Sequence, residues 1–263
     1  MPLEQRPEYR HLLARKEGAL ATLVLSRAER KNALGPVLIN ELLWALDDAH
    51  DDPDVRVIVL SGAGKAFCAG ADLREMTGKG EESGLAPKGD LAQLLLRFPK
   101  LHKPVIAKVH GEALGGGLGL VASCHFAIAG ESAQLGTPEI LRGLFPMQIM
   151  AVLGRLMPQR QLIEMMLLGL TVSAATAARW GLLNRVVPDA DLDGEVHALA
   201  STLSERSPTA VRAGLEAFDG QTGKPLEEAM PYLRDQLMTL LVQPDAIEGL
   251  MAFMQKRSPH WES

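Results

Sequence analysis

Residues 104–120 read PVIAKVHGEALGGGLGL and combine three features that decide the fold. Residues 104–109 have the β-branched, apolar composition of a buried strand, and residues 118–123 continue as an apolar helix. The glycine triplet 115–117 lies between them. It allows close backbone approach and presents free amide groups at a helix start, where the helix dipole favours negative charge. A tight turn without a ligand accounts for the triplet equally well.

Two nucleotide-binding loops are excluded at the glycine-bearing segments. In a dinucleotide fingerprint the third glycine after the strand would fall at position 120, which is Leu120. In a phosphate-binding loop Lys65 would be followed by serine or threonine, but Ala66 follows it. The glycines therefore predict another use of the backbone.

Strands and helices alternate on both sides of this segment. Residues 19–25, 55–60 and 125–129 have strand composition, and Leu38, Leu42 and Leu46 follow Pro36 at helical spacing. This alternation predicts an α/β fold. Beyond residue 146 helical patterns dominate, over 148–156, 159–168, 174–180, 192–205, 208–218, 226–242 and 246–256. We expect an α/β core over residues 1–195 and a helical region over 196–263, and a mobile surface loop over the glycine- and charge-rich residues 78–89.

Composition limits the class of protein. The chain has 263 residues, 47% of them hydrophobic and 22% charged, as in soluble globular proteins. Its net charge of -5 disfavours a nucleic-acid binder. It contains neither the apolar stretch of a secretory signal nor one that would span a membrane. With Cys68 and Cys124 as its two cysteines, a cytoplasmic protein that binds no membrane is expected.

A second segment, 67–76 (FCAGADLREM), contains a possible helix start. Asp72 and Glu75 have the spacing of a capping box, in which each side chain accepts a hydrogen bond from the other residue's amide. We therefore expect the amides just before Asp72 to lie at a strand-to-helix corner.

Three segments together are similar to one enzyme family. Residues 65–76 (KAFCAGADLREM), 110–120 (HGEALGGGLGL) and 133–143 (AQLGTPEILRG) resemble successive signature segments of the enoyl-CoA hydratase/isomerase (crotonase-like) family, in the same order and with matching separations. The similarity extends over about residues 19–257. It implies a crotonase-like fold of stacked ββα units followed by a C-terminal helical region.

The resemblance also implies a site for an acyl-CoA thioester. The backbone amides of Ala71 and Gly116 would form an oxyanion hole for the thioester carbonyl oxygen, and one such donor can be worth about 3 kcal/mol. The substrate and its coenzyme A portion would be lined by Lys31, Ala33, Ala69, Gly70, Asp72, Leu73 and Gly115. Coenzyme A would enter with the substrate, with no metal or other cofactor, and the chains would form homotrimers or homohexamers through the helical region.

The acid/base residues decide the reaction. Hydratases of the family use two glutamates, and the first of these positions is Gly119 here, whereas the second is Glu139. One carboxylate beside an oxyanion hole suits a 1,3-proton shift, which favours Δ3-Δ2 enoyl-CoA isomerisation. Hydration with a substitute group, for which Glu112 is the first candidate, and acyl-CoA binding without catalysis stay open. Met147 and Met150 follow Glu139 closely enough to line an acyl pocket.

Overall fold

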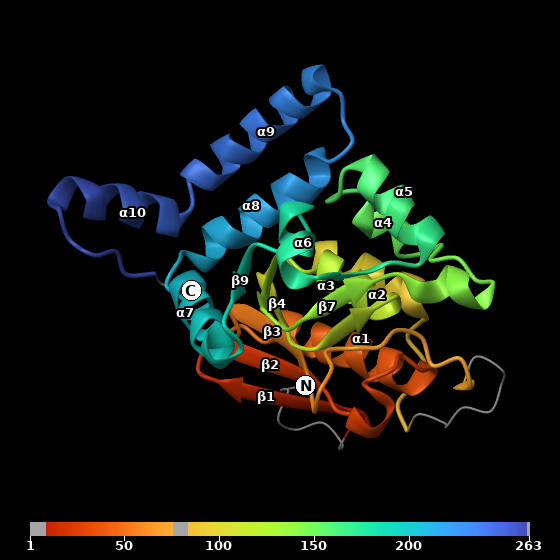
Figure 1. Ribbon diagram of the computed structural model, residues 1–263. Helices are drawn as coiled ribbons and strands as arrows, with labels where there is room; N and C mark the ends of the chain where they lie inside the picture. Colours follow the sequence, from red (N-terminus) through yellow and green to blue (C-terminus); the bar gives the residue numbers. More distant parts are fainter. Residues whose placement is uncertain (1–8, 76–83, 262–263) are drawn as a thin grey trace.

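The computed structural model describes residues 9–75 and 84–261 and contains two sheets (Figure 1). The larger sheet has the order β1 (Leu12–Glu17), β2 (Leu20–Leu25), β3 (Val57–Gly62), β4 (Val105–Val109), β6 (Phe126–Gly130) and β9 (Arg185–Val187). β1 is antiparallel to β2, and the other neighbours are parallel. The smaller sheet has the order β5 (Glu112–Leu114), β7 (Gln134–Gly136) and β8 (Thr171–Ser173).

Both faces of the larger sheet are covered by helices. Along β3, Ile58 and Leu60 point into the main core with α1 (Pro36–Asp51) and α3 (Gly116–Ser123). The alternate residues Val57 and Val59 pack on the other face, in a cluster with Leu192, Val196 and Ala200 of α7 (Leu192–Ser204). Successive strand residues face opposite sides, so a parallel sheet covered on both faces reads as a continuous apolar run. This arrangement confirms the predicted α/β fold.

The remaining α-helices, apart from α2, lie in the second half of the chain. They are α2 (Leu91–Arg97), α4 (Met150–Leu153), α5 (Gln159–Leu168), α6 (Ala174–Arg179), α8 (Pro208–Gln221), α9 (Leu226–Leu241) and α10 (Pro244–Gln255). α9 and α10 stand away from the sheets (Figure 1). The predicted division between core and helical region, at residue 195, falls within α7, which packs on the sheet.

Strand β1 did not emerge from the sequence, where its charges obscured its alternating pattern. Leu12 is buried, and the residues that follow alternate between intermediate and exposed positions, with Arg15 and Glu17 exposed. Every residue of β1 pairs with β2. An edge strand tolerates such charges because one side of it faces solvent.

The predicted mobile loop 78–89 lies partly outside the described residues, and its second half is fastened to α1. Asn40 donates from Nδ2 to the Ala86 carbonyl at 3.1 Å and accepts the Lys88 amide at 2.7 Å. Trp44 donates from Nε1 to the same carbonyl at 2.9 Å. The Lys88 ammonium contacts the Asp47 carboxylate and lies 3.7 Å from the centre of the Trp44 ring. Residues 85–88 are therefore held against α1, which differs from the free surface loop that the sequence predicts.

No single helix in the described part of the chain is long and apolar enough to cross a membrane. The pair α9 and α10 passes that test by length and composition, with a bend of 74° between the two helices.

Candidate active site

Three segments distant in sequence meet at the start of α3. The Leu114 amide donates to the Cys68 carbonyl at 2.9 Å, which joins the glycine triplet to residues 68–72. Leu34 then bridges to Ala71: its amide donates to the Gly70 carbonyl at 2.7 Å, and its carbonyl accepts the Asp72 amide at 2.9 Å. These backbone bonds hold the glycine triplet, residues 68–72 and Leu34 together at one corner of the structure.

The amides of Ala71 and Gly116 are close together at this corner. A Cβ atom placed on Gly116 would lie 3.9 Å from the Ala71 nitrogen, and one placed on Gly70 would lie 3.5 Å from the Gly116 nitrogen. Gly116 is the first residue of α3, where an amide has no partner within the helix. The hydrogen bonds to Leu34 use the Gly70 carbonyl and the Asp72 amide, on either side of Ala71. The Ala71 amide therefore faces away from Leu34. Within the described residues, neither amide has a backbone acceptor.

Glu139 lies against the same glycine turn. It belongs to the 3-10 helix η5 (Pro138–Arg142), which follows β7. A Cβ atom on Gly115 would lie 2.7 Å from Glu139 Oε1, so a side chain at that position would collide with the carboxylate. Gly115 also has φ 51°, a conformation that favours glycine. Glycine at 115 thus allows the carboxylate to approach the start of α3.

The surroundings of the Glu139 carboxylate favour its neutral form. Its Oε2 is buried and has no hydrogen-bond partner among the described residues. Burial raises the pKa of Glu139 above its ordinary value, because desolvation penalises the charged form, and this outweighs a backbone hydrogen bond and the charge of Arg142. A glutamate with a raised pKa is suited to take up and return a proton near neutral pH.

A buried ion-pair cluster of Arg27, Asp72 and Glu75 stabilises the segment that contains Ala71. Arg27 donates to Asp72 Oδ2 at 3.0 Å and contacts Glu75 Oε1, and all three side chains are buried. Asp72 Oδ1 also accepts the Arg74 amide at 3.0 Å and the Glu75 amide at 3.4 Å. The capping half contributed by Asp72 is therefore present. The other predicted half, in which the Glu75 carboxylate accepts the Asp72 amide, is wrong. The Glu75 carboxylate contacts Arg27 instead, and the Asp72 amide donates to the Leu34 carbonyl.

Arg27 is a positioning residue that sequence reasoning missed. It lies 45 residues from Asp72, and neither its spacing nor its neighbours distinguish it from a surface arginine. Two acidic residues close together, Asp72 and Glu75, are the signal that could have prompted a search for a buried cation to balance their charges.

The predicted coenzyme A residues are brought together in part. Ala69 donates to the Lys31 carbonyl at 2.9 Å, so the turn carrying Lys31 and Ala33 lies beside residues 69–72. Leu73 is exposed. The Asp72 carboxylate is occupied by Arg27. The roles of these residues, and of Ala71, Gly116 and Glu139, stay predictions.

Glu112 is engaged elsewhere. Its two oxygens accept hydrogen bonds from Lys31 Nζ at 3.1 and 2.9 Å. In this ion pair the Glu112 side chain is 38% exposed and the Lys31 side chain is 61% exposed. Such a pair is solvated, whereas Glu139 is enclosed by the glycine turn.

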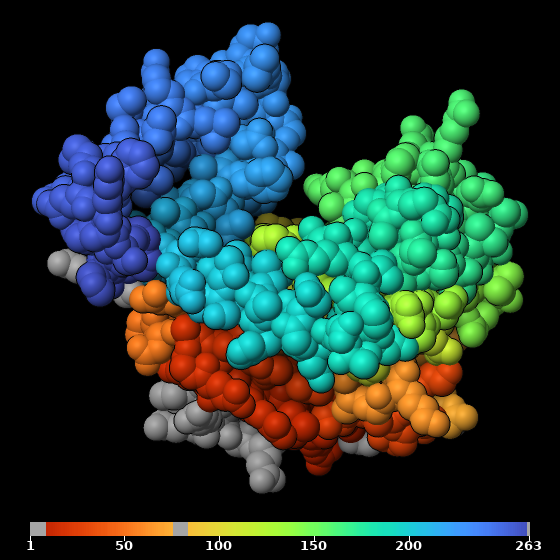
Figure 2. All heavy atoms as spheres, turned by 60° about the vertical axis from the view of Figure 1, so that its left-hand side comes forward, coloured from red at the N-terminus to blue at the C-terminus, as the bar shows by residue number. Residues whose placement is uncertain are grey.

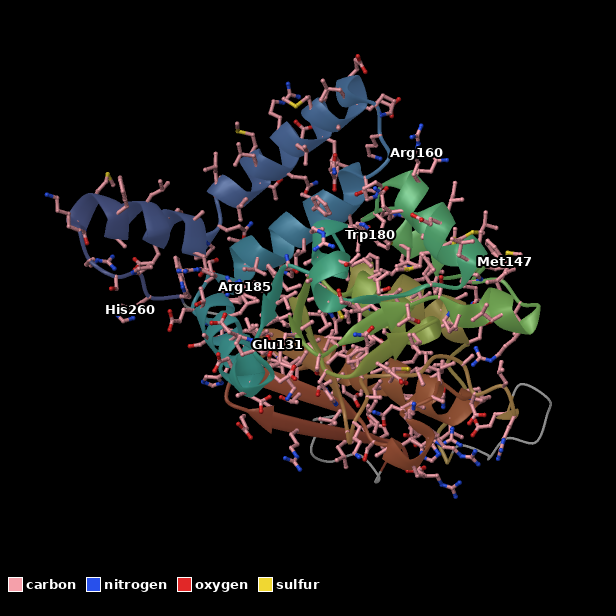
Figure 3. All side chains as sticks on the ribbon, in the orientation of Figure 1. Glu131, Met147, Arg160, Trp180, Arg185 and His260 are labelled. Atoms are coloured by element: carbon pink, nitrogen blue, oxygen red, sulfur yellow. The ribbon has the colours of Figure 1, made fainter. Side chains whose placement is uncertain are left out.

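Apolar side chains near η5 are open to solvent. Met147 is 64% exposed and lies at the outer edge of the molecule beyond η5 (Figure 3), and Met150 is also exposed. A hollow lies between the C-terminal helices, in blue, and the green segment that contains α4 and α5 (Figure 2). Over residues 9–75 and 84–261, no group of three or more histidine, cysteine or acidic residues is gathered as a metal site would require.

Comparison with known proteins agrees with the fold. The sequence profile of the enoyl-CoA hydratase/isomerase family matches residues 15–263. Enoyl-CoA hydratase domain-containing protein 3 of Xenopus laevis is 33% identical over 94% of this chain and 84% of its own. Mevalonyl-coenzyme A hydratase of Aspergillus fumigatus is 36% identical over 91% of this chain and 90% of its own. The crystal structure of an enoyl-CoA hydratase from Mycobacterium smegmatis superimposes with a TM-score of 0.88 and 34% identity, over 96% of this chain and 99% of the other.

The fold and the family profile define a crotonase-like enzyme. The chain belongs to the enoyl-CoA hydratase/isomerase family, whose members act on acyl-CoA thioesters.

Proposed function

We propose that this enzyme converts a 3-enoyl-CoA into the conjugated 2-enoyl-CoA, with Glu139 as its acid and base. The observation that carries the proposal is the Glu139 carboxylate, which lies against Gly115 with Oε2 buried and unpaired among the described residues. Gly119, one turn along α3, has no group that could transfer a second proton. Coenzyme A would enter as part of the substrate.

The reaction is a proton shift with no net change in atoms. Glu139 takes a proton from C2, and the electron pair of that C–H bond is delocalised over the thioester and the C3=C4 double bond. The carbonyl oxygen of this dienolate carries the negative charge between the Ala71 and Gly116 amides. Glu139 then returns the proton to C4, which leaves a C2=C3 double bond conjugated with the carbonyl.

The electrostatics support both roles. Fixed amide donors stabilise an oxyanion without reorganising, and removing one typically costs about 3 kcal/mol in activation free energy. The raised pKa of Glu139 makes it a stronger base once ionised, and it makes the neutral acid available to return the proton. Both functions need a carboxylate shielded from water, as the inaccessible Oε2 is.

Hydration of a 2-enoyl-CoA is the second candidate, and the names of the relatives favour it. The Mycobacterium smegmatis and Aspergillus fumigatus proteins are both called hydratases. Hydration would need a second group to handle the protons of water. Glu112 is less suited to that task, because its carboxylate is held by Lys31.

A paired turnover assay tests the proposal. Purified protein is given a 3-enoyl-CoA, with formation of the conjugated product followed, and separately a 2-enoyl-CoA, with loss of conjugation followed. We expect isomerisation to exceed hydration. Glu139→Gln should lower isomerisation about 10²–10⁴-fold and leave acyl-CoA binding nearly intact. Glu131→Gln, at an exposed glutamate before β7 (Figure 3), is the matched control and should keep full activity.

Full activity of Glu139→Gln would overturn the assignment of Glu139. Rapid hydration by the wild-type enzyme would favour the second candidate and direct attention to Glu112. Tight binding of coenzyme A esters with no turnover of any alkenoyl thioester would favour a non-catalytic acyl-CoA-binding protein.

We further propose that the chains assemble as homotrimers, or as homohexamers made of two trimers, through the C-terminal helices. Large apolar side chains on α8, α9 and α10 are exposed in the single chain. They include Phe218, Met230, Leu237, Met238, Leu250, Phe253 and Met254. Apolar surface on this scale is typical of protein contacts.

A further inference from the structure

Gly119 faces a wall of buried apolar side chains. A Cβ atom placed on Gly119 would lie 2.5 Å from Ile149 Cγ2 and 3.1 Å from Ile149 Cβ, with Leu95 Cδ2 at 3.7 Å. Ile149 is 2% exposed, and Leu95 is also buried. The space that a side chain at position 119 would enter is therefore already filled by Ile149.

The wall formed by Ile149 and Leu95 lies on the same face of α3 as the Glu139 carboxylate. Gly115 and Gly119 are four residues apart, and the Gly119 amide donates to the Gly115 carbonyl at 3.0 Å. Residues at this spacing lie one above the other on a helix. Gly115 contacts the Glu139 carboxylate, and Gly119 contacts Ile149, one turn further on.

The chemistry of water addition gives this wall a function. To hydrate a 2-enoyl-CoA, the oxygen of water bonds to C3, a proton of that water passes to a base, and a proton is added at C2. A buried water molecule needs two or more polar partners. The side chains of Ile149 and Leu95 offer no polar atom, and Gly119 has no side chain.

We propose that Ile149 is a specificity-determining residue, which fills the space beside Gly119, excludes water from that side of the acyl group and directs the enolate to reprotonation by Glu139. This inference rests on the proposed isomerase function. It also explains why a glutamate introduced at position 119 alone would not be accommodated: its Cβ atom would meet Ile149 before its carboxylate could reach the substrate.

The test measures the ratio of hydration to isomerisation in four variants. Gly119→Glu should remain without added hydration, because Ile149 blocks the new side chain. Ile149→Ala should raise the ratio at least about threefold by admitting water, and Ile149→Thr should raise it similarly by adding a hydroxyl to the wall, with a smaller loss of volume than alanine. Gly119→Glu combined with Ile149→Ala should raise it at least about tenfold. Ile163→Ala, at an exposed position on α5, is the matched control and should leave the ratio unchanged.

The outcomes separate this inference from the proposed function. An unchanged ratio in Ile149→Ala, Ile149→Thr and the double variant, with wild-type isomerisation intact, would overturn the role of Ile149 alone. Strong hydration by Gly119→Glu alone would do the same. If the wild-type enzyme does not isomerise, the proposed function fails, whereas a gain of hydration in the double variant would still support exclusion of water by Ile149.

A thermal denaturation cycle gives a readout that does not depend on turnover. Gly119→Ala should lower the melting temperature in the wild-type background, since the added methyl meets Ile149 Cγ2. The same change should cost less in Ile149→Ala, where that atom is gone and only the Cβ atom at 3.1 Å remains. Equal losses in both backgrounds would contradict the packing on which the inference depends.

Discussion

The corner around α3 and the helices α8–α10 differ in where their side chains find partners. At the corner, even charged and polar groups such as Arg27, Asn32 and Asp72 are buried and paired within the chain. On α10, by contrast, Phe253 is 83% exposed and Met254 is 73% exposed. The corner is complete in one chain, whereas the C-terminal helices present apolar surface that would be covered in an assembly. Substitutions should therefore affect folding at the corner and association at the helices.

The largest expected effect on stability is at the Arg27 cluster. Arg27→Met would leave the carboxylates of Asp72 and Glu75 buried without their cation, and breaking a buried pair in this way typically costs about 3–5 kcal/mol. Urea denaturation should show this loss. In contrast, Arg257→Met breaks the exposed pair with Glu248 and should change the unfolding midpoint little. Equal effects of the two substitutions would remove the distinction between the two regions.

Glycine-to-alanine substitutions sharpen the same distinction. An alanine methyl at Gly117 would lie 2.3 Å from the Cys68 carbonyl oxygen, and overpacking of this kind typically costs about 1–3 kcal/mol. At Gly214 in α8 nothing among the described residues lies within 4 Å of the added atom. Gly214→Ala should therefore stabilise the chain by about 0.5–1 kcal/mol. Thermal denaturation of both variants measures the difference, and a loss of stability in Gly214→Ala would indicate packing there that the single chain lacks.

Association should respond to changes on α10. Phe253→Ser with Met254→Ser removes two large exposed apolar side chains. Light scattering after size-exclusion chromatography should show a smaller particle, and the far-ultraviolet circular dichroism of the folded chain should be retained. Leu13→Ser, at an exposed position on β1, is the matched control and should leave the mass unchanged. An unchanged mass in the double variant would argue against contacts through α10.

The smallest effect is the pH dependence of stability at Glu139. Because burial raises the pKa of Glu139 in the folded state, the folded chain binds this proton more tightly than the unfolded chain. The stability due to this proton is present below the ordinary glutamate pKa and is lost as pH rises through the raised value. The melting temperature of Glu139→Gln relative to wild type should thus increase from pH 4 to pH 8. A difference that is constant with pH would contradict the raised pKa.

The fold was largely predictable because its signals are local. The apolar runs at β3 and β4 and the spacing of Leu38, Leu42 and Leu46 on α1 each depend on a few neighbouring residues. The same reasoning failed where a partner distant in sequence competed with a local one. Asp72 and Glu75 have the spacing of a capping box, but the complete box forms at Asp90 and Gln93, which begin α2. At Glu75 a buried arginine from another strand end outweighed the local partner.

The candidate site shows the same difference between local signals and contacts distant in sequence. The corner residues lie within continuous motifs, so the closeness of Ala71 to Gly116 and of Gly115 to Glu139 agrees with their prediction as one site. Arg27 and Ile149 reach the corner from outside the three signature segments. A single sequence records neither the contact of Ile149 with Gly119 nor the ion pair that occupies Glu112.

The proposed oxyanion donors at Ala71 and Gly116 belong to the main chain, and this has an evolutionary consequence. Every amino acid except proline supplies an amide N–H, so ordinary point substitutions at these positions cannot delete the donor itself. Mutation acts instead on the side chains around it, such as those at positions 119, 139 and 149. A lineage could in this way exchange one acyl-CoA reaction for another and still inherit the device that holds the negative charge.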